Sequence, residues 1–118
     1  VAGPRYFPTT ARDQALIFHK IYKSELISAD ASSSMLQLLL TQRIKDYMRM
    51  GLPPETEVAH KTGLILEYAN DAGVIYGERG PFILVILTRR EDNSWSSFPM
   101  AQEVMTGLAR AAYSMHGR

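Results

Sequence analysis

Lys61, Thr62 and Gly63 are consecutive residues whose types suit the binding of an anionic, extended ligand. The lysine offers a positive charge, the threonine offers a short hydroxyl donor, and the glycine lets a ligand lie close to the backbone. The residues on either side, 58–60 and 64–66, are apolar enough to be typical of a strand. An edge strand with such a trio would form one wall of an anion-binding site.

The sequence contains no evident nucleophile to accompany this trio. No serine or threonine has a lysine three residues later, no Ser-Asp-Asn triplet occurs, and cysteine is absent. The serines of Ser28–Ser34 have no base nearby in the sequence, so we expect them to cap a helix. His19, His60 and His116 lack the spacing of a metal site, and no glycine loop could cradle phosphate, so we expect neither metal nor cofactor.

Several segments carry a resemblance to a known family. They are Thr9–Asp13 opening a helix, Arg49–Pro53 ending another, Val58–Gly63, Asn70-Asp71, and a terminal helix. Together they resemble the C-terminal portion of a class A β-lactamase-like or penicillin-binding-protein-like serine hydrolase. Of the family's three boxes, Ser-x-x-Lys, Ser-Asp-Asn and Lys-Thr-Gly, only the third is present. The resemblance covers nearly the whole chain, which would hold only the last part of the family's fold.

The resemblance implies a role for each residue of the trio and for two others. Lys61 matches the lysine beside the nucleophile and the ligand carboxylate, and Thr62 matches the hydroxyl that contacts this carboxylate. Gly63 matches the position where the acyl group approaches, and the backbone N–H of Leu64 matches one oxyanion donor. Arg49 stands where some class A enzymes hold the substrate carboxylate with an arginine. The alternative for Arg49 is a solvent-facing charge at a helix end.

Two further positions near the trio, His60 and Asn70-Asp71, are assigned no chemistry. His60 replaces the aspartate or histidine usual before the lysine, and we expect an outward or packed strand residue rather than a base. Asn70-Asp71 is predicted to form the turn into a second strand. Family members usually place Ser or Thr and further Gly after the trio, whereas Leu64–Glu67 follows here. This departure makes the ligand side of the strand more apolar, which indicates a different ligand or none.

Helical periodicity predicts two helices before the trio. The first spans about residues 11–26 after an N-cap at Thr9 or Thr10. The second follows the serine segment, continues to about Met48, and is closed by Gly51–Pro54. Strands are predicted over 57–68, 72–76 and 82–88, and a last helix is predicted after a cap at Ser96 or Ser97, with Pro99 in its first turn. The apolar stripe of that helix is Ala101, Val104, Met105, Leu108, Ala112 and Met115, and Gly107 is expected to pack closely on the sheet.

This order of elements predicts an α+β fold: two helices, a three-stranded antiparallel meander and a C-terminal helix. We expect one partial domain over 1–118, with a helical part (1–52) and a part holding the sheet and last helix (53–118). The run Phe82–Thr88 is apolar at nearly every position, which favours burial on both faces of a sheet. Since no later strand covers its second edge, the missing N-terminal portion or a homodimer partner is expected to cover it.

Composition excludes several classes of protein. The 118 residues are 46% hydrophobic and 21% charged, with a net charge of +1, which describes an ordinary folded domain and gives no reason to propose nucleic acid as a partner. No apolar run approaches the length of a membrane span, and no signal peptide is evident. The resemblance implies a secreted or cell-envelope protein.

Two functional hypotheses follow. The first is a segment of a serine acyl hydrolase that acts on a β-lactam or a D-Ala-type peptide carbonyl, with the nucleophile supplied elsewhere. The second is a non-catalytic binding or interaction module of the cell envelope on the same scaffold. Because the nucleophile is missing, this chain alone should not hydrolyse a β-lactam.

Overall fold

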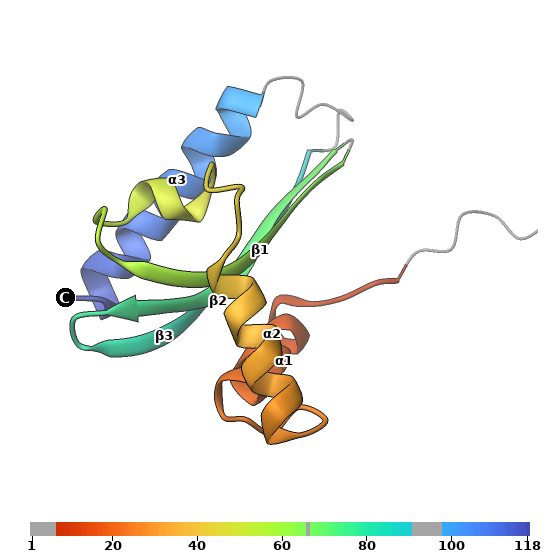
Figure 1. The fold of residues 1–118 in the computed structure, drawn as a ribbon. Coiled ribbons are helices and arrows are strands. Elements are labelled where there is room, and N and C mark those ends of the chain that lie inside the picture. Colours follow the sequence, from red (N-terminus) through yellow and green to blue (C-terminus); the bar gives the residue numbers. More distant parts are fainter. Residues whose placement is uncertain (1–6, 66, 91–97) are drawn as a thin grey trace, which may run out of the picture.

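The computed structural model describes residues 7–65, 67–90 and 98–118 (Figure 1). In these parts of the chain it holds the following elements, in order. They are α1 (Ala11–Tyr22), α2 (Ala29–Leu40), the 3-10 helix η1 (Met48–Gly51), β1 (Glu57–Ile65), β2 (Tyr68–Gly77), β3 (Gly80–Arg89) and α3 (Phe98–His116). The predicted α+β class and the order of two helices, three strands and a C-terminal helix are confirmed.

The three strands form one antiparallel sheet in the order β1-β2-β3. The central strand β2 pairs with β1 as far as Ile65 opposite Tyr68, and with β3 as far as Gly77 opposite Gly80. Gly80 has a φ of 118°, a conformation that glycine adopts without steric cost, so this residue allows the tight turn into β3. Both β1 and β3 are edge strands in the described part of the chain.

Helices cover the two faces of the sheet (Figure 1). On one face, α3 and η1 pack together and close the larger core, whereas α1 and α2 lie against the other face. The larger core contains Tyr47, Met48, Leu52, Val58, Ala69, Ile75, Ile86, Ala101, Met105, Ala109 and Tyr113. The smaller core contains Phe18, Ala59, Ala72 and Val74. We call these the α3 face and the α1 face.

Hydroxyl side chains begin the first two helices as predicted. Thr10 and Ser28 are N-caps, and each side-chain oxygen accepts a hydrogen bond of 3.1 Å from the backbone N–H three residues later. The fully buried hydroxyl of Ser32 accepts from the N–H of Leu26 (3.0 Å) and donates to its carbonyl (2.8 Å). The capping role expected for the serine segment is therefore confirmed at Ser28. The caps predicted at residues 96 and 97 lie outside the described residues.

Both N-terminal helices are shorter than predicted. The first ends at Tyr22, because Ser24 takes a φ of 62° and breaks the helix before residue 26. The second ends at Leu40 and not near residue 48, because Thr41 closes it with its hydroxyl on the carbonyl of Leu38 (3.0 Å). The apolar residues that extend the helical pattern past Leu40 belong to a separate segment that leads into η1.

Gly51 lies where η1 packs against the backbone of α3. A Cβ at this position would lie 2.2 Å from the carbonyl oxygen of Thr106. The hydroxyl of Thr106 in turn donates to the carbonyl of Tyr47 at 3.3 Å. The glycine predicted to end a long helix therefore serves close contact between two elements. Gly107 was expected to do this but is exposed, and a Cβ there would meet no described atom within 4 Å.

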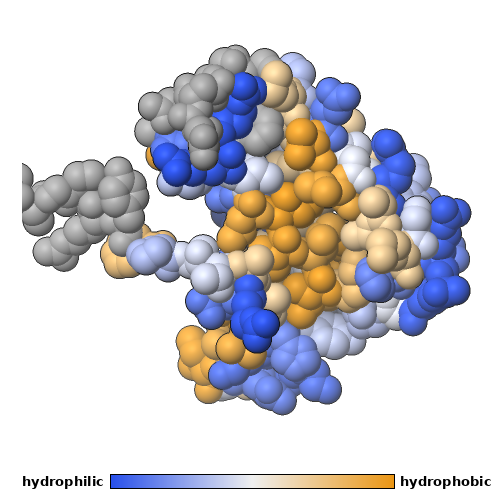
Figure 2. Space-filling model, turned by 180° about the vertical axis from the view of Figure 1, so that it is seen from behind, coloured by the Kyte–Doolittle hydropathy of each residue, from blue (hydrophilic) through white to orange (hydrophobic). Residues whose placement is uncertain are grey.

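The apolar stripe predicted for α3 is split between two surroundings. Ala101 and Met105 are fully buried in the larger core, whereas Leu108 and Met115 are 48% and 68% exposed. The exposed residues continue onto β3, where they line a groove of about 550 Å³. We call this the β3–α3 groove, and it is lined by Ala11, residues 82–88, Leu108, Ala112, Met115 and His116. Figure 2 shows a broad apolar surface on this side of the molecule. The burial of β3 on both faces is therefore incomplete within this chain.

Candidate functional site

Strand β1 carries four of the predicted site residues at one edge of the sheet. Lys61 is paired with Ala72 of the smaller core, and Thr62 is paired with Asp71. Because side chains alternate along a strand, Lys61 points toward the α1 face and Thr62 toward the α3 face. Thr62 is buried and Lys61 is exposed. The charge and the hydroxyl of the trio therefore flank the strand from opposite sides.

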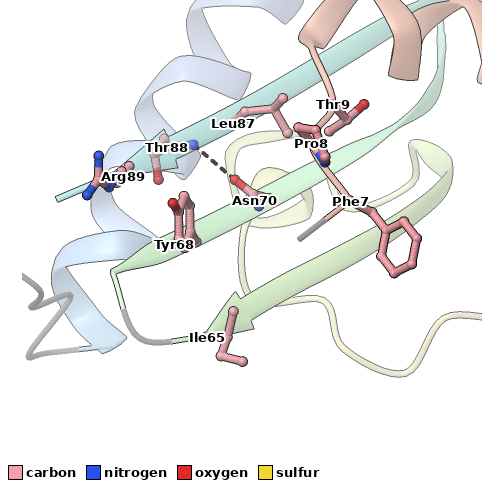
Figure 3. A pocket seen from close by; sticks show the side chains of 9 residues that line it. All are labelled: Phe7, Pro8, Thr9, Ile65, Tyr68, Asn70, Leu87, Thr88 and Arg89. Carbon is pink, nitrogen blue, oxygen red and sulfur yellow. Dashed lines mark hydrogen bonds between the residues drawn. The ribbon is translucent and has the colours of Figure 1, made fainter. Parts of the chain in front are cut away.

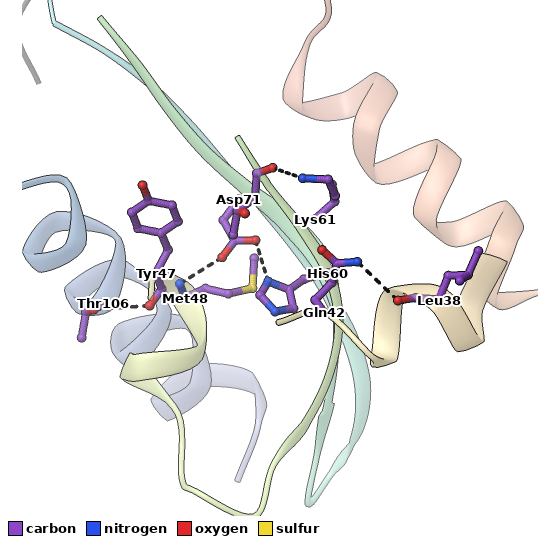
Figure 4. Close-up of polar contacts among 9 residues, drawn as sticks. Leu38, Gln42, Tyr47, Met48, His60, Lys61, Asp71 and Thr106 are labelled. Carbon is purple, nitrogen blue, oxygen red and sulfur yellow. Dashed lines mark hydrogen bonds and ion pairs between the residues drawn. The ribbon is translucent and has the colours of Figure 1, made fainter. Parts of the chain in front are cut away.

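Lys61 borders a cavity of about 240 Å³ between β1 and the N-terminal part of α1. We call this cavity the Lys61 pocket; Thr62, Gly63, Gln14 and Phe18 also line it. The Nζ of Lys61 donates to the carbonyl of Thr62 at 2.6 Å (Figure 4). The ammonium group is thus held beside its own strand, where an anion could take the place of this carbonyl.

Open space lies beside the third residue of the trio. A Cβ at Gly63 would have no described atom within 4 Å, and the next residue, Leu64, is 46% exposed. The outer edge of β1 has no strand partner among the residues that the structure describes. The structure therefore brings Lys61, Thr62, Gly63 and Leu64 to one open edge, with room for a ligand along it.

A buried hydrogen bond between a histidine and an aspartate lies directly behind this edge. Nδ1 of His60 is 2.9 Å from Oδ1 of Asp71, and Oδ2 of Asp71 accepts from the backbone N–H of Met48 at 3.1 Å (Figure 4). The His60 and Asp71 side chains are only 2% and 0% exposed. One carboxylate thus connects β1, β2 and η1. The prediction that His60 is a packed or outward strand residue is confirmed in its packed form.

The turn predicted at Asn70-Asp71 is wrong, because both residues lie inside β2. β2 begins at Tyr68, and its antiparallel pairing with β1 brings Asp71 beside His60. The side-chain oxygen of Asn70 accepts from the N–H of Thr88 at 3.0 Å, so this residue binds to β3 and not to a turn. A carboxylate inside an apolar strand run was the available sequence signal, since buried carboxylates require partners.

Tyr47 is close enough to Asp71 for the charge of this carboxylate to act on its hydroxyl. Burial is the largest influence on its hydroxyl, followed by the negative charges of Asp46 and Asp71, and together they raise the pKa of Tyr47 above the usual value for a tyrosine. This residue is 2% exposed, and its backbone carbonyl accepts the hydroxyl of Thr106. Tyr47 is therefore a buried member of the larger core, which also contains Val58 of β1.

The side chain of Arg49 binds backbone carbonyls that lie outside the open β1 edge. Its guanidinium donates to the carbonyl of Pro53 at 3.0 Å and to the carbonyl of Pro54. It lines a polar cavity of about 230 Å³ that also touches His60, and this cavity is separate from the Lys61 pocket. The structure therefore does not bring Arg49 together with Lys61, and its role at a ligand carboxylate stays a prediction.

An apolar pocket of about 480 Å³ adjoins the Lys61 pocket (Figure 3). The two share Thr9, Asn70 and Leu87, so they form neighbouring parts of one surface on the α1 face. Ile65, Tyr68 and Arg89 line its far end. A ligand bound at Lys61 would thus have apolar and aromatic surface within reach at the end of the sheet.

Two other kinds of site have no counterpart in the described residues. In residues 7–65, 67–90 and 98–118, no three His, Cys, Asp or Glu side chains are grouped so that they could hold a metal ion. Among the helices that the structure describes, none is long and apolar enough to cross a membrane.

Comparisons with known proteins identify the architecture. Among curated proteins, none matches this chain. Solved structures do match, and one is "Structure of PBP-A", at 25% identity and a TM-score of 0.75 over 88% of this chain and 38% of that one. The TLA-3 extended-spectrum β-lactamase matches at 22% identity and a TM-score of 0.81, over 93% of this chain and 42% of that one. A class A β-lactamase from Mycobacterium abscessus matches at 19% identity and a TM-score of 0.79, over 91% and 41%.

The chain therefore spans about two-fifths of the length of the structures it matches. It has their fold over this span, with the helices and the antiparallel sheet described above. A family model described as the β-lactamase enzyme family matches residues 4–115, which is nearly the whole sequence. On this evidence the chain belongs to the β-lactamase enzyme family.

Proposed function

We propose that this chain is the C-terminal segment of a serine β-lactamase-like acyl hydrolase, and that β1 is one wall of its acylation site. The observation that carries the proposal is the open edge of β1, where Lys61 borders a pocket and Gly63 leaves open space. An extended ligand with a carboxylate could lie along this edge, within reach of a positive charge and of backbone groups.

The proposed reaction is acyl transfer to a serine that lies outside this chain. The serine Oγ loses its proton and bonds to the carbonyl carbon of a β-lactam or a D-Ala-type peptide, the C–N bond of that amide breaks, and its nitrogen takes up the proton that the serine lost. Water then cleaves the new ester. Lys61 and Thr62 would hold the ligand carboxylate from the two sides of β1, and the N–H of Leu64 would bind the oxyanion. Arg49 would join them only after leaving its proline carbonyls.

The comparisons support this proposal at the level of family. The family match covers residues 4–115, and one solved structure at 25% identity is that of a PBP-A mutant described as an acyl-enzyme complex with penicillin G. Members of such a family meet their substrates outside the cytoplasm, so we also propose a secreted or cell-envelope location. Resistance of a host to β-lactams would follow only if the complete protein turns over these compounds.

We further propose that polypeptide outside this chain pairs with β3. Its free edge and the β3–α3 groove expose apolar side chains, including Leu87 at 37% and Leu108 at 48%. Edge strands of this kind recruit other strands unless they are covered. The N-terminal portion of the same protein is the proposed partner, and a second copy of this chain is the alternative. Cross-linking β3 to either partner would distinguish them.

Turnover of a chromogenic cephalosporin tests the proposed function. The chain alone and the complete protein that contains it are compared at equal concentration. We expect hydrolysis or stable acylation only with the complete protein, because this chain lacks the attacking serine. If the complete protein is folded but neither hydrolyses the compound nor becomes acylated by a labelled penicillin or a D-Ala-D-Ala peptide, a non-catalytic envelope module is the better assignment.

A further inference from the structure

The Asp71 carboxylate adds side-chain contacts that join η1 to β1 and β2, two strands that are already paired through their backbones. It belongs to β2, it contacts Nδ1 of His60 on β1 at 2.9 Å, and it accepts the N–H of Met48 on η1 at 3.1 Å. Each of its two oxygens thus has a partner on a different element. Figure 4 shows both contacts beneath the strand that carries Lys61.

Burying a histidine and an aspartate in a core has a cost in free energy. Burying a carboxylate and an imidazole is unfavourable unless their polar atoms are hydrogen bonded, and apolar residues of similar volume often stabilise a fold better. Met48, Val58 and Ile75 of the larger core belong to the same elements as the pair, and a polar cavity also touches His60. Stability alone does not account for the pair, which suggests a role in orientation.

The geometry identifies what is oriented. His60 and Thr62 point toward the α3 face, where Asp71 lies, and Lys61 stands between them on the other face. The contact between His60 and Asp71 disfavours a rotation or a one-residue slip of β1. Either change would turn Lys61 toward the larger core and break the buried contact. The direction of the Lys61 side chain therefore depends on a contact one residue away.

The other end of the link is fixed by α3. The N–H of Met48 belongs to η1, whose Gly51 packs on the backbone of α3, and the carbonyl of Tyr47 accepts the hydroxyl of Thr106. Asp71 thus connects η1, which packs on α3, to a strand with one neighbouring strand among the described residues.

We propose that Asp71 and His60 are positioning residues that hold β1 so that Lys61 faces the ligand edge. The inference deepens the proposed function and rests on it. Neither side chain touches the ligand, and their effect is carried by the backbone between residues 60 and 64. Misplacing a binding group by about 1 Å can cost on the order of 10²-fold in rate.

Two substitutions of His60 test this in the complete protein. His60→Asn keeps an amide N–H donor at the position of Nδ1, whereas His60→Leu removes the donor and keeps a similar volume. Met105→Ala is the matched control, since it opens the larger core from α3 and leaves the His60–Asp71 contact in place. Should His60→Leu fail to fold, His60→Gln replaces it, because its donor is displaced by one carbon.

The readouts are the rate of acylation by a fluorescent penicillin, the melting temperature, and amide hydrogen exchange over residues 60–64. We expect His60→Leu to lose about 10²-fold in acylation rate. His60→Asn and Met105→Ala should remain within about threefold of the parent protein, although Met105→Ala melts at least as low as His60→Leu. Equal losses in His60→Leu and Met105→Ala, or an equal loss in His60→Asn, would overturn the inference.

Failure of the proposed function gives a different pattern. In that case the parent protein itself is not acylated, and amide exchange decides the positioning role alone. Faster exchange at residues 61–64 in His60→Leu, and not in the other two variants, supports the inference. Unchanged exchange in this segment would exclude it.

Discussion

The two edges of the sheet, β1 and β3, differ in how their positions are fixed. Among the described residues, both edge strands pair with β2 alone. β1 presents polar groups and a glycine at its open edge, and the buried His60–Asp71 contact lies behind it. β3 presents an apolar edge and groove. The edge with chemical groups is therefore organised locally, whereas the apolar edge is left for association.

Replacing Lys61 tests the ligand edge and should have the largest effect. Lys61→Ala removes the positive charge beside the pocket, and truncating one partner of a charged hydrogen bond costs about 3 kcal/mol, or about 10²-fold. We expect this loss in the acylation rate of the complete protein, measured with a fluorescent penicillin. Lys20→Ala, an exposed lysine on α1, is the control and should leave the rate unchanged. Parental acylation in Lys61→Ala would remove β1 from the proposed site.

A charge in the β3–α3 groove tests the apolar edge. Leu108→Lys and Leu38→Lys alter two exposed helical leucines, at 48% and 68% exposure, but only Leu108 lines the groove. If other polypeptide covers the groove, Leu108→Lys should lower the free energy of unfolding of the complete protein by about 2 kcal/mol. Leu38→Lys should stay within about 0.5 kcal/mol, as surface changes usually do. Equal urea midpoints for the two variants would mean that the groove faces solvent.

Two strand glycines, Gly73 and Gly63, differ in the room around them, so substituting each distinguishes an effect on packing from an effect on ligand binding. A Cβ at Gly73 would lie 2.3 Å from the carbonyl oxygen of Ala59 and 2.6 Å from Cβ of His60, whereas a Cβ at Gly63 meets nothing. Gly73→Ala should therefore cost about 1–3 kcal/mol in thermal unfolding, as overpacking does. Gly63→Ala should leave stability within about 0.5 kcal/mol and lower only the acylation rate. A stability loss at Gly63 would show that the edge is already occupied.

The smallest expected effect is on the free energy of unfolding at alkaline pH. Because burial raises the pKa of Tyr47, the unfolded chain loses the phenol proton at a lower pH than the folded chain. The stabilising contribution is complete below about pH 10 and declines as the pH rises above it. Tyr47→Phe should therefore show a shallower fall in unfolding free energy between about pH 10 and 11 than the parent protein. Parallel curves for the two proteins would contradict the shift.

Local patterns were sufficient to predict the order of elements and the residues on β1. The capping hydroxyls and the apolar strand runs each act over a few neighbouring residues, and these predictions are confirmed. The resemblance carried by several segments, Val58–Gly63 among them, led to the family, which the match over residues 4–115 confirms. These signals are short in range, so a single sequence contains them.

The errors arise where tertiary contacts override local preference. The helical spacing past Leu40 was interrupted because η1 packs on α3 through Gly51. Asn70-Asp71 has turn propensity, but the buried partners of Asp71 favour the strand. The two sides of α3 could not be separated, because apolar residues that face a core and those that face an open groove look alike in sequence.

The meander described above has a consequence for how such a chain could acquire its structure. Each strand pairs with its immediate successor, so the loops that must close are short and the entropy lost in closing them is small. The hairpins can therefore assemble early, before distant segments arrive. If the polypeptide were divided before β1, the C-terminal piece would still contain hairpins that form from contacts between neighbouring strands. A division at this point therefore suits split-protein complementation by two separately expressed pieces.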